Sequence, residues 1–178
     1  MFPVSLTGPS LTLREMQPDD VEALHSVYGD ATTVEHLSFT PRTVTQCSTV
    51  IDSAVQDAQT DPRTVYMLAA EFDGRLVGAA RMAQDERPHS AQIGFAIRHD
   101  LWGRGLGAEL VELLLRLGFE QLRYARIWGA RSPENPASQA VMNRAGMVEE
   151  GRIRRHLRTD TGWRDSIVHS VLCDEWSA

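Results

Sequence analysis

The chain has 178 residues, of which 42% are hydrophobic and 24% charged, and 24 acidic residues against 18 basic ones give a net charge of −6. This length and composition predict one globular domain spanning residues 1–178, and they exclude a disordered chain. The acidic balance disfavours nucleic acid as a partner, because binding to phosphates needs a basic surface.

Cysteine, histidine and hydropathy patterns give no sign of a metal site or a membrane segment. Cys47 and Cys173 are far apart and form no CxxC pair, and the histidines show no HExxH spacing. No apolar stretch approaches the roughly 18 residues that cross a bilayer, and no basic stretch followed by an apolar run opens the chain. We therefore expect no metal, no membrane partner and a cytoplasmic location.

The first part of the chain predicts a strand followed by two helices. Residues 11–14 alternate in hydrophobicity, as a strand does. Pro18, followed by two aspartates, favours the start of a helix that runs to about Gly29. A second helix is expected over residues 44–58. The segment between these helices, residues 30–41, is predicted to be irregular.

A three-stranded meander is expected next. Residues 65–72 and 76–82 are apolar runs joined by Asp73-Gly74, a strong hairpin signal. Residues 91–97 form the third predicted strand, after a polar turn.

The second part of the chain predicts a helix, a strand, a helix and a closing hairpin. Leucines recur on one side of a helix that starts at Leu106. A strand is expected over 124–130 and a helix over 135–144, stopped by Gly146. The final hairpin pairs residues 147–157 with 163–172, around a turn at Asp160, Thr161 and Gly162. This order predicts an α+β fold around one mixed sheet.

Three alternating glycines are the most informative motif. Gly103, Gly105 and Gly107 precede a helix that has no Ser, Thr or Asp cap of its own. The first amides of a helix lack intrahelical partners and carry the positive end of its dipole. Glycine lets the backbone approach a ligand closely, so a phosphate or pyrophosphate is the natural guest. The alternative is a tight strand–helix turn with no ligand.

A dinucleotide site is a second interpretation of these glycines. Gly103, Gly105 and Ala108 fit the pattern GxGxxG/A. That pattern also requires an acidic residue after the next strand, where this chain has residues 128–131, Trp-Gly-Ala-Arg. A dinucleotide-dependent oxidoreductase is therefore the weaker alternative.

At this point the chain resembles a known family. Residues 93–97 and 102–107 are similar to the acetyl-CoA-binding core of the GCN5-related N-acetyltransferases (GNATs). Residues 135–138 (Asn-Pro-Ala-Ser) and 144–147 (Arg-Ala-Gly-Met) resemble a second block of that family, and the final hairpin resembles the branch that acetylates ribosomal-protein N-termini. The resemblance implies a mixed, mostly antiparallel central sheet with splayed middle strands and flanking helices. It also implies acetyl-CoA as co-substrate and a homodimer.

The same resemblance assigns the site residues. Pantetheine would lie between the splayed strands, and the pyrophosphate would lie on the amides of the glycine segment. The residues implied in cofactor binding are Phe95, Ala96, Ile97, Trp102, Gly103, Arg104, Gly105, Leu106, Gly107, Ala108, Asn135 and Ser138. Asn135 would bond the cofactor or hold the strand, and it is also a good helix cap.

Transfer of an acetyl group to an amine needs an oxyanion donor, a base and an acid for the departing thiolate. The amide near Ile97 is the candidate oxyanion donor. Many family members place a Tyr where this chain has Met142, which donates no proton. Ser138 is then the candidate acid, and the alternative is a serine that bonds locally within its helix. Asn135 and Ser138 are thus the candidate catalytic pair.

The base is not identified by the sequence. The carboxylate common on the central strand is missing, because Gln92 stands there. Water chains are one candidate, and the side chains that remain open are Glu35, His36, Glu71, Asp85 and His89. The acceptor is an amine, either a protein N-terminus or a small molecule. Because two familiar catalytic positions lack their usual chemistry, a non-catalytic CoA-binding module stays open as an alternative.

Overall fold

One eight-stranded sheet dominates the computed structural model, which describes residues 3–159 and 162–177. The strands are β1 (Ser5–Thr7), β2 (Leu11–Glu15), β3 (Val65–Phe72), β4 (Arg75–Gln84), β5 (Ser90–Ile97), β6 (Arg126–Arg131), β7 (Val148–Thr159) and β8 (Gly162–Leu172). Their order is β1-β2-β3-β4-β5-β6-β8-β7. Among the described strand pairs only β5 and β6 run parallel. The mixed, mostly antiparallel sheet is therefore confirmed.

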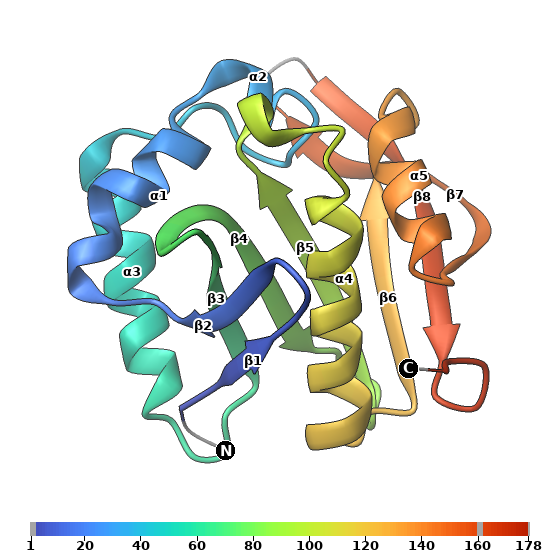
Figure 1. The fold of residues 1–178 in the computed structure, drawn as a ribbon. Helices are drawn as coiled ribbons and strands as arrows, with labels where there is room; N and C mark the ends of the chain where they lie inside the picture. The colour runs from blue at the N-terminus through green and yellow to red at the C-terminus, as the bar shows by residue number, and fades with distance from the viewer. Residues whose placement is uncertain (1–2, 160–161, 178) are drawn as a thin grey trace.

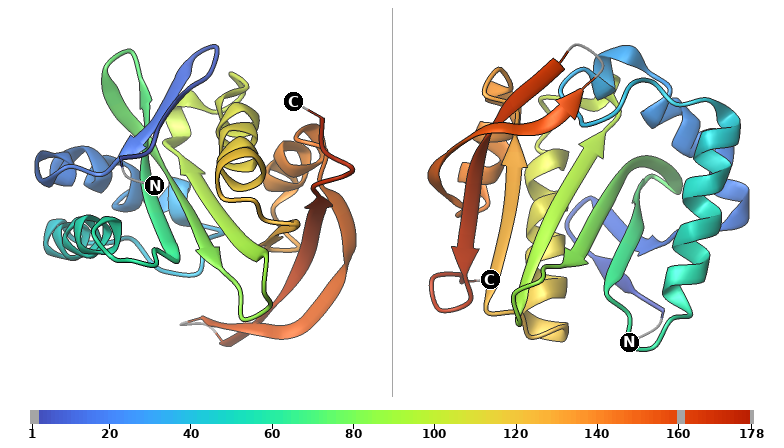
Figure 2. Two further views of the ribbon diagram at one scale, coloured as in Figure 1. Left: turned by 90° about the horizontal axis from the view of Figure 1, so that it is seen from below. Right: turned by 180° about the vertical axis from the view of Figure 1, so that it is seen from behind.

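Helices cover both faces of this sheet (Figures 1 and 2). They are η1 (Pro18–Asp20), α1 (Val21–Tyr28), α2 (Ala31–Val34), α3 (Val44–Ala58), η2 (His99–Leu101), α4 (Leu106–Arg116), the π-helical η3 (Leu117–Gln121) and α5 (Pro136–Arg144). One face packs against α1 and α3, which contact β4 and β3, and the other face packs against α4 and α5. No helix in the described part of the chain is long and apolar enough to cross a membrane.

The leucine stripe of α4 forms the core of its face, as predicted. Leu110 and Leu114 have no exposed surface, and Leu106 and Leu113 are buried beside them. Val111 and Leu115 are buried as well. The helix therefore buries a wider arc than the predicted stripe, because β2 and β4 also contact it.

Two short elements depart from the prediction. The segment 30–41 is not wholly irregular, because the Asp30 carboxylate accepts a hydrogen bond from the Thr33 amide at 2.7 Å and caps α2. The strand β1 was missed, since three residues are too few to show alternation. The predicted turn residues Asp160 and Thr161 lie outside the described residues.

A carboxylate on α4 holds the β1–β2 hairpin in place. Glu109 Oε1 accepts hydrogen bonds from the amides of Ser10, at 2.6 Å, and Leu11, at 2.7 Å. The start of the chain is thereby fixed to the first turn of the helix that follows the glycine segment.

The sheet opens between its two parallel strands. Pairing of β5 with β6 runs from Ser90 and Arg126 to Ile93 and Gly129. Beyond that point β5 continues to Ile97 paired with β4, while β6 continues paired with β8. The two strands diverge toward their C-terminal ends, and the N-terminal end of α4 lies near this opening (Figure 1). The predicted splay of the middle strands is present.

Candidate functional site

The glycine segment forms a cap-free start for α4. Gly103 and Gly105 have φ angles of 76° and 84°, in the left-handed region that favours glycine. Gly105 is the N-cap residue and makes no side-chain capping bond. A Cβ atom built on Gly105 would meet no atom within 4 Å. The space beside the N-cap of α4 is therefore open, as an anion site at a helix N-terminus requires.

The side chains next to these glycines fix the segment in place. Leu106 and Ala108 are buried, so their side chains pack in the protein and do not face a ligand. Trp102 donates from Nε1 to the carbonyl of Ile97 at 2.7 Å and stays 49% exposed. The guanidinium of Arg104 lies over the ring of Phe72, 5.2 Å from its centre. The segment is thus tied to the ends of β5 and β3.

The last residues of β5 provide an unpaired strand edge. Phe95, Ala96 and Ile97 pair with β4 on one side, and no described residue of β6 pairs with them on the other. An unpaired edge exposes amides and carbonyls to which an extended ligand can bond as an added strand, although the Ile97 carbonyl already accepts from Trp102 Nε1.

The helix α5 packs close to this opening because two residues that face it, Gly107 in α4 and Gly129 in β6, have no side chain. A Cβ on Gly107 would lie 3.1 Å from Val141, so α5 packs closely on the first turn of α4. A Cβ on Gly129 would lie 3.6 Å from the sulfur of Met142, a residue that is 1% exposed. Gly129 is the last β6 residue paired with β5. The second half of α5 is therefore held beside the point where the sheet opens.

Asn135 and Ser138 lie together at the N-terminal end of α5. Asn135 Oδ1 accepts a hydrogen bond from the Ser138 amide at 2.9 Å, so Asn135 caps the helix. Within the described residues the Ser138 hydroxyl has no hydrogen-bond partner in the protein. Ser138 precedes Met142 by one helical turn, so both lie on the same side of α5. The structure thus brings together the glycine segment, the free edge of β5 and the helix α5, whose first turn carries Ser138.

The candidate bases are scattered. Glu71 is ion-paired with Arg14 at 2.7 Å, and Glu35 and His89 are exposed. The backbone carbonyl of His36 accepts from Arg164. Asp85 lines a pocket that also contains residues of β6, and the other four do not line it.

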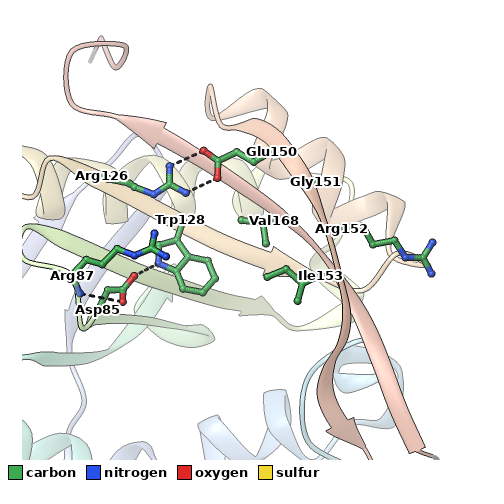
Figure 3. Close-up of a pocket in the computed structure, with 9 residues that line it drawn as sticks. All are labelled: Asp85, Arg87, Arg126, Trp128, Glu150, Gly151, Arg152, Ile153 and Val168. Carbon is green, nitrogen blue, oxygen red and sulfur yellow. Dashed lines mark hydrogen bonds and ion pairs between the residues drawn. The ribbon is translucent and has the colours of Figure 1, made fainter.

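That pocket, here called the Trp128 pocket, has a volume of about 340 Å³ (Figure 3). It is lined by Asp85, Arg87, Arg126, Trp128, Glu150, Gly151, Arg152, Ile153 and Val168. Ile127 packs in the same core as the leucines of α4, so its neighbours Arg126 and Trp128 face the opposite side of the sheet. Apart from Asp85, these residues were missed from the sequence, although alternation along β6 places Arg126 and Trp128 on one face.

A hydrogen bond from Trp128 holds Asp85 in the pocket. The Trp128 Nε1 donates to Asp85 Oδ2 at 3.0 Å, and Ser90 Oγ lies 3.3 Å from the same oxygen. Burial raises the pKa of Asp85, but these hydrogen bonds, with those from neighbouring amides, outweigh it and lower the pKa overall. Asp85 is therefore a weak proton acceptor.

The structure meets one of the two requirements of a dinucleotide site and lacks the other. The parallel unit β5–α4–β6 is present, but β6 ends at Arg131 and offers no carboxylate there. Residues 3–159 and 162–177 contain no cluster of three or more His, Cys, Asp or Glu side chains suited to a metal ion.

Comparison with known proteins gives a consistent result. A family model described as an acetyltransferase (GNAT) domain matches residues 10–148. An uncharacterized N-acetyltransferase, p20, from Bacillus licheniformis is 25% identical over 169 residues, which cover 94% of this chain and 95% of that protein. The ribosomal protein uS5-alanine N-acetyltransferase of Escherichia coli is 25% identical over 104 residues, 57% of this chain and 54% of that protein. Mycobacterium smegmatis RimJ, solved in complex with CoA-disulfide, has the same fold, with a TM-score of 0.83 at 22% identity over 99% of this chain and 89% of that one.

Proposed function

Because this chain belongs to the GNAT family of acetyltransferases, we propose that it transfers an acetyl group from acetyl-CoA to a primary amine by direct attack in a ternary complex. The observation that carries this proposal is the juxtaposition of a cap-free helix start with a free strand edge at the opening of the sheet. The uS5-alanine relative supports a protein N-terminal α-amino group as the acceptor, and a small-molecule amine is the other acceptor class.

Different residues of the opening bind different parts of acetyl-CoA. The amides of the first turn of α4, after Gly105, bind the pyrophosphate, and the Arg104 guanidinium lies next to them. The free edge at Phe95, Ala96 and Ile97 bonds the pantetheine. This arrangement directs the thioester toward the start of α5.

The chemical step uses groups at the same place. The acceptor nitrogen forms a bond to the thioester carbon, and the amide near Ile97 stabilises the oxyanion. The carbon–sulfur bond then breaks, the Ser138 hydroxyl protonates the thiolate, and the proton that the newly bonded nitrogen loses returns to the Ser138 oxygen, directly or through water. A free amine has a pKa of about 8 to 10, so the acceptor must lose a proton before it attacks, and water or one of the candidate bases other than Asp85 accepts that proton.

Acetyl-CoA is expected to stabilise the fold, whereas NAD(P)H is not. A ligand at 100 times its dissociation constant adds about 2.7 kcal/mol to the free energy of unfolding. For a chain of this length that raises Tm by roughly 5–10 °C. A thermal-shift titration measures both ligands, and stabilisation by NAD(P)H alone would favour the dinucleotide interpretation instead.

Turnover separates an enzyme from a CoA-binding module. Thiol release from acetyl-CoA, followed over a panel of peptides and small amines, is expected to depend on the amine. Binding of acetyl-CoA without thiol release from any amine would contradict the proposed function.

We also propose that the chain acts as a homodimer of single-domain subunits, by resemblance to the ribosomal-protein branch alone. Sedimentation at micromolar concentration is expected to give twice the 19.8 kDa mass of the chain. A monomer in that measurement would remove the dimer and leave the chemistry unchanged.

A further inference from the structure

The Trp128 pocket lies where an acceptor can reach the opening of the sheet. Trp128 pairs with Gln92, one position before the last β5–β6 pair. Ala130 lies on the same face of β6, two residues further along and beside the opening. Two residues of strand span about 7 Å, so a group in the pocket lies about that far from an amine at the opening.

Most charges of the pocket are already neutralised within the protein (Figure 3). Arg126 donates to both oxygens of Glu150, at 2.7 and 2.6 Å. Hydrogen bonds from Arg126 and Ser170 lower the pKa of Glu150 to about 2. Arg152 is paired with Asp165 at 2.7 Å. These groups have little capacity left for a ligand.

Arg87 is the exception. Its side chain extends toward Trp128 (Figure 3). Within the described residues its guanidinium makes no hydrogen bond or ion pair, and its charge acts on Glu150 only through space, as a minor cause of the lowered pKa of that carboxyl. Asp85, the remaining charge, already accepts bonds from Trp128, Ser90 and the Arg87 amide. A guanidinium has five N–H donors and no acceptor. The Arg87 guanidinium therefore has free donors in this pocket, and a carboxylate is the acceptor that suits them best.

The rest of the pocket is apolar. The Trp128 ring, Val168 and the 41% exposed Ile153 all line it. The pocket volume of about 340 Å³ is at the lower end of the range for small-ligand sites. An apolar stem that ends in a carboxylate fits this combination, as the side chain of Asp or Glu does.

We propose that the Trp128 pocket selects acceptor peptides with an acidic side chain at the second residue, and that Arg87 determines this specificity. In an extended peptide, a carboxylate on the second residue lies about 7 Å from the terminal amine, which matches the distance along β6. This inference rests on the proposed N-acetyltransferase function and adds the class of acceptor to it.

Three peptides that differ only at the second residue test the proposal. They begin Ala-Asp, Ala-Asn and Ala-Lys and then share one sequence. We expect kcat/KM to be about 10-fold higher for the Asp peptide than for the Asn peptide, at the low end for a hydrogen bond to a charged group because Arg87 is exposed. In Arg87→Gln this ratio is expected to fall to about one, and in Arg87→Glu the Lys peptide is expected to become the best of the three.

Arg154→Gln is the matched control. Arg154 is an exposed arginine of β7 that does not line the Trp128 pocket. It is expected to keep the Asp preference. The dissociation constant of acetyl-CoA, measured for each variant, checks that the cofactor side of the fold is intact.

The outcomes distinguish the two proposals. Turnover with equal kcat/KM for all three peptides would overturn the acidic specificity and leave the N-acetyltransferase function standing. An Asp preference that survives in Arg87→Gln would also overturn the assignment to Arg87. No thiol release from any peptide or amine would overturn the proposed function and, with it, this inference.

Discussion

Replacing Gly105 with Asp is expected to weaken acetyl-CoA binding by about 100-fold or more, because two like charges a few ångströms apart near a protein surface repel by several kcal/mol. The new carboxylate would lie at the N-cap of α4, next to the proposed pyrophosphate. The fold should persist, since a Cβ at Gly105 meets no atom within 4 Å. The backbone strain of a left-handed non-glycine residue costs only about 1–3 kcal/mol. Calorimetric titration of acetyl-CoA measures the effect, with circular dichroism as the check on folding.

Two further variants isolate the charge. Gly105→Asn has nearly the same shape without the charge and is expected to lose much less affinity. Gly74→Asp adds the same charge in the β3–β4 turn, where φ is 71° and the space is also open, and should bind acetyl-CoA normally. If Gly105→Asp binds acetyl-CoA as the unsubstituted protein does, the phosphates do not lie on the amides of α4.

Replacing Ser138 with Ala is expected to lower kcat by roughly 10- to 100-fold, at the low end of general acid catalysis. A thiol with a pKa near 8.5 is already a fair leaving group, so proton donation gives only part of the rate. The Ser138 hydroxyl is free for this role, since the described residues offer it no hydrogen-bond partner. Met142, one turn later on the same side of α5, supplies no proton. Single-turnover kinetics measures this step.

The dissociation constant of acetyl-CoA should change little in Ser138→Ala, because the backbone contacts to phosphates and pantetheine remain. Ser138→Thr keeps the hydroxyl and is expected to recover most of the lost rate. An unchanged kcat in the Ala variant would leave water as the proton source and Ser138 without a catalytic role.

Local signals explain why much of the fold was predictable. Asp73 and Gly74 both have positive φ in the β3–β4 turn, as their type of hairpin requires. The leucines of α4 follow the helical period, and Asn135 caps α5 with a side chain that sequence alone suggests. By contrast, β1 and α2 are too short for a periodic signal. Tertiary contacts, such as the Glu109 carboxylate on the Ser10 amide, stabilise β1 instead.

The site was predictable only in the part whose residues are contiguous in the sequence. The glycine segment lies in a continuous stretch of chain, so its geometry follows from local rules. The Trp128 pocket instead joins residues around Asp85 to residues of β6, β7 and β8, which meet only through strand pairing. Neither Arg87 nor Trp128 differs from an ordinary surface residue until that pairing is known. Their roles, like those of Ser138 and Asn135, remain predictions for the experiments above.

The bond between Glu109 and the first hairpin has a consequence for the order of folding. It joins the amides of Ser10 and Leu11 to a helix about one hundred residues later in the chain. A loop of that length closes late, since its entropy must be overcome before the contact forms. The meander β3–β5 and the α4 helix can assemble first from contacts between near neighbours in sequence. We therefore expect the β1–β2 hairpin to be among the last parts of the molecule to reach its final position, after the first turn of α4, which it contacts, has already formed.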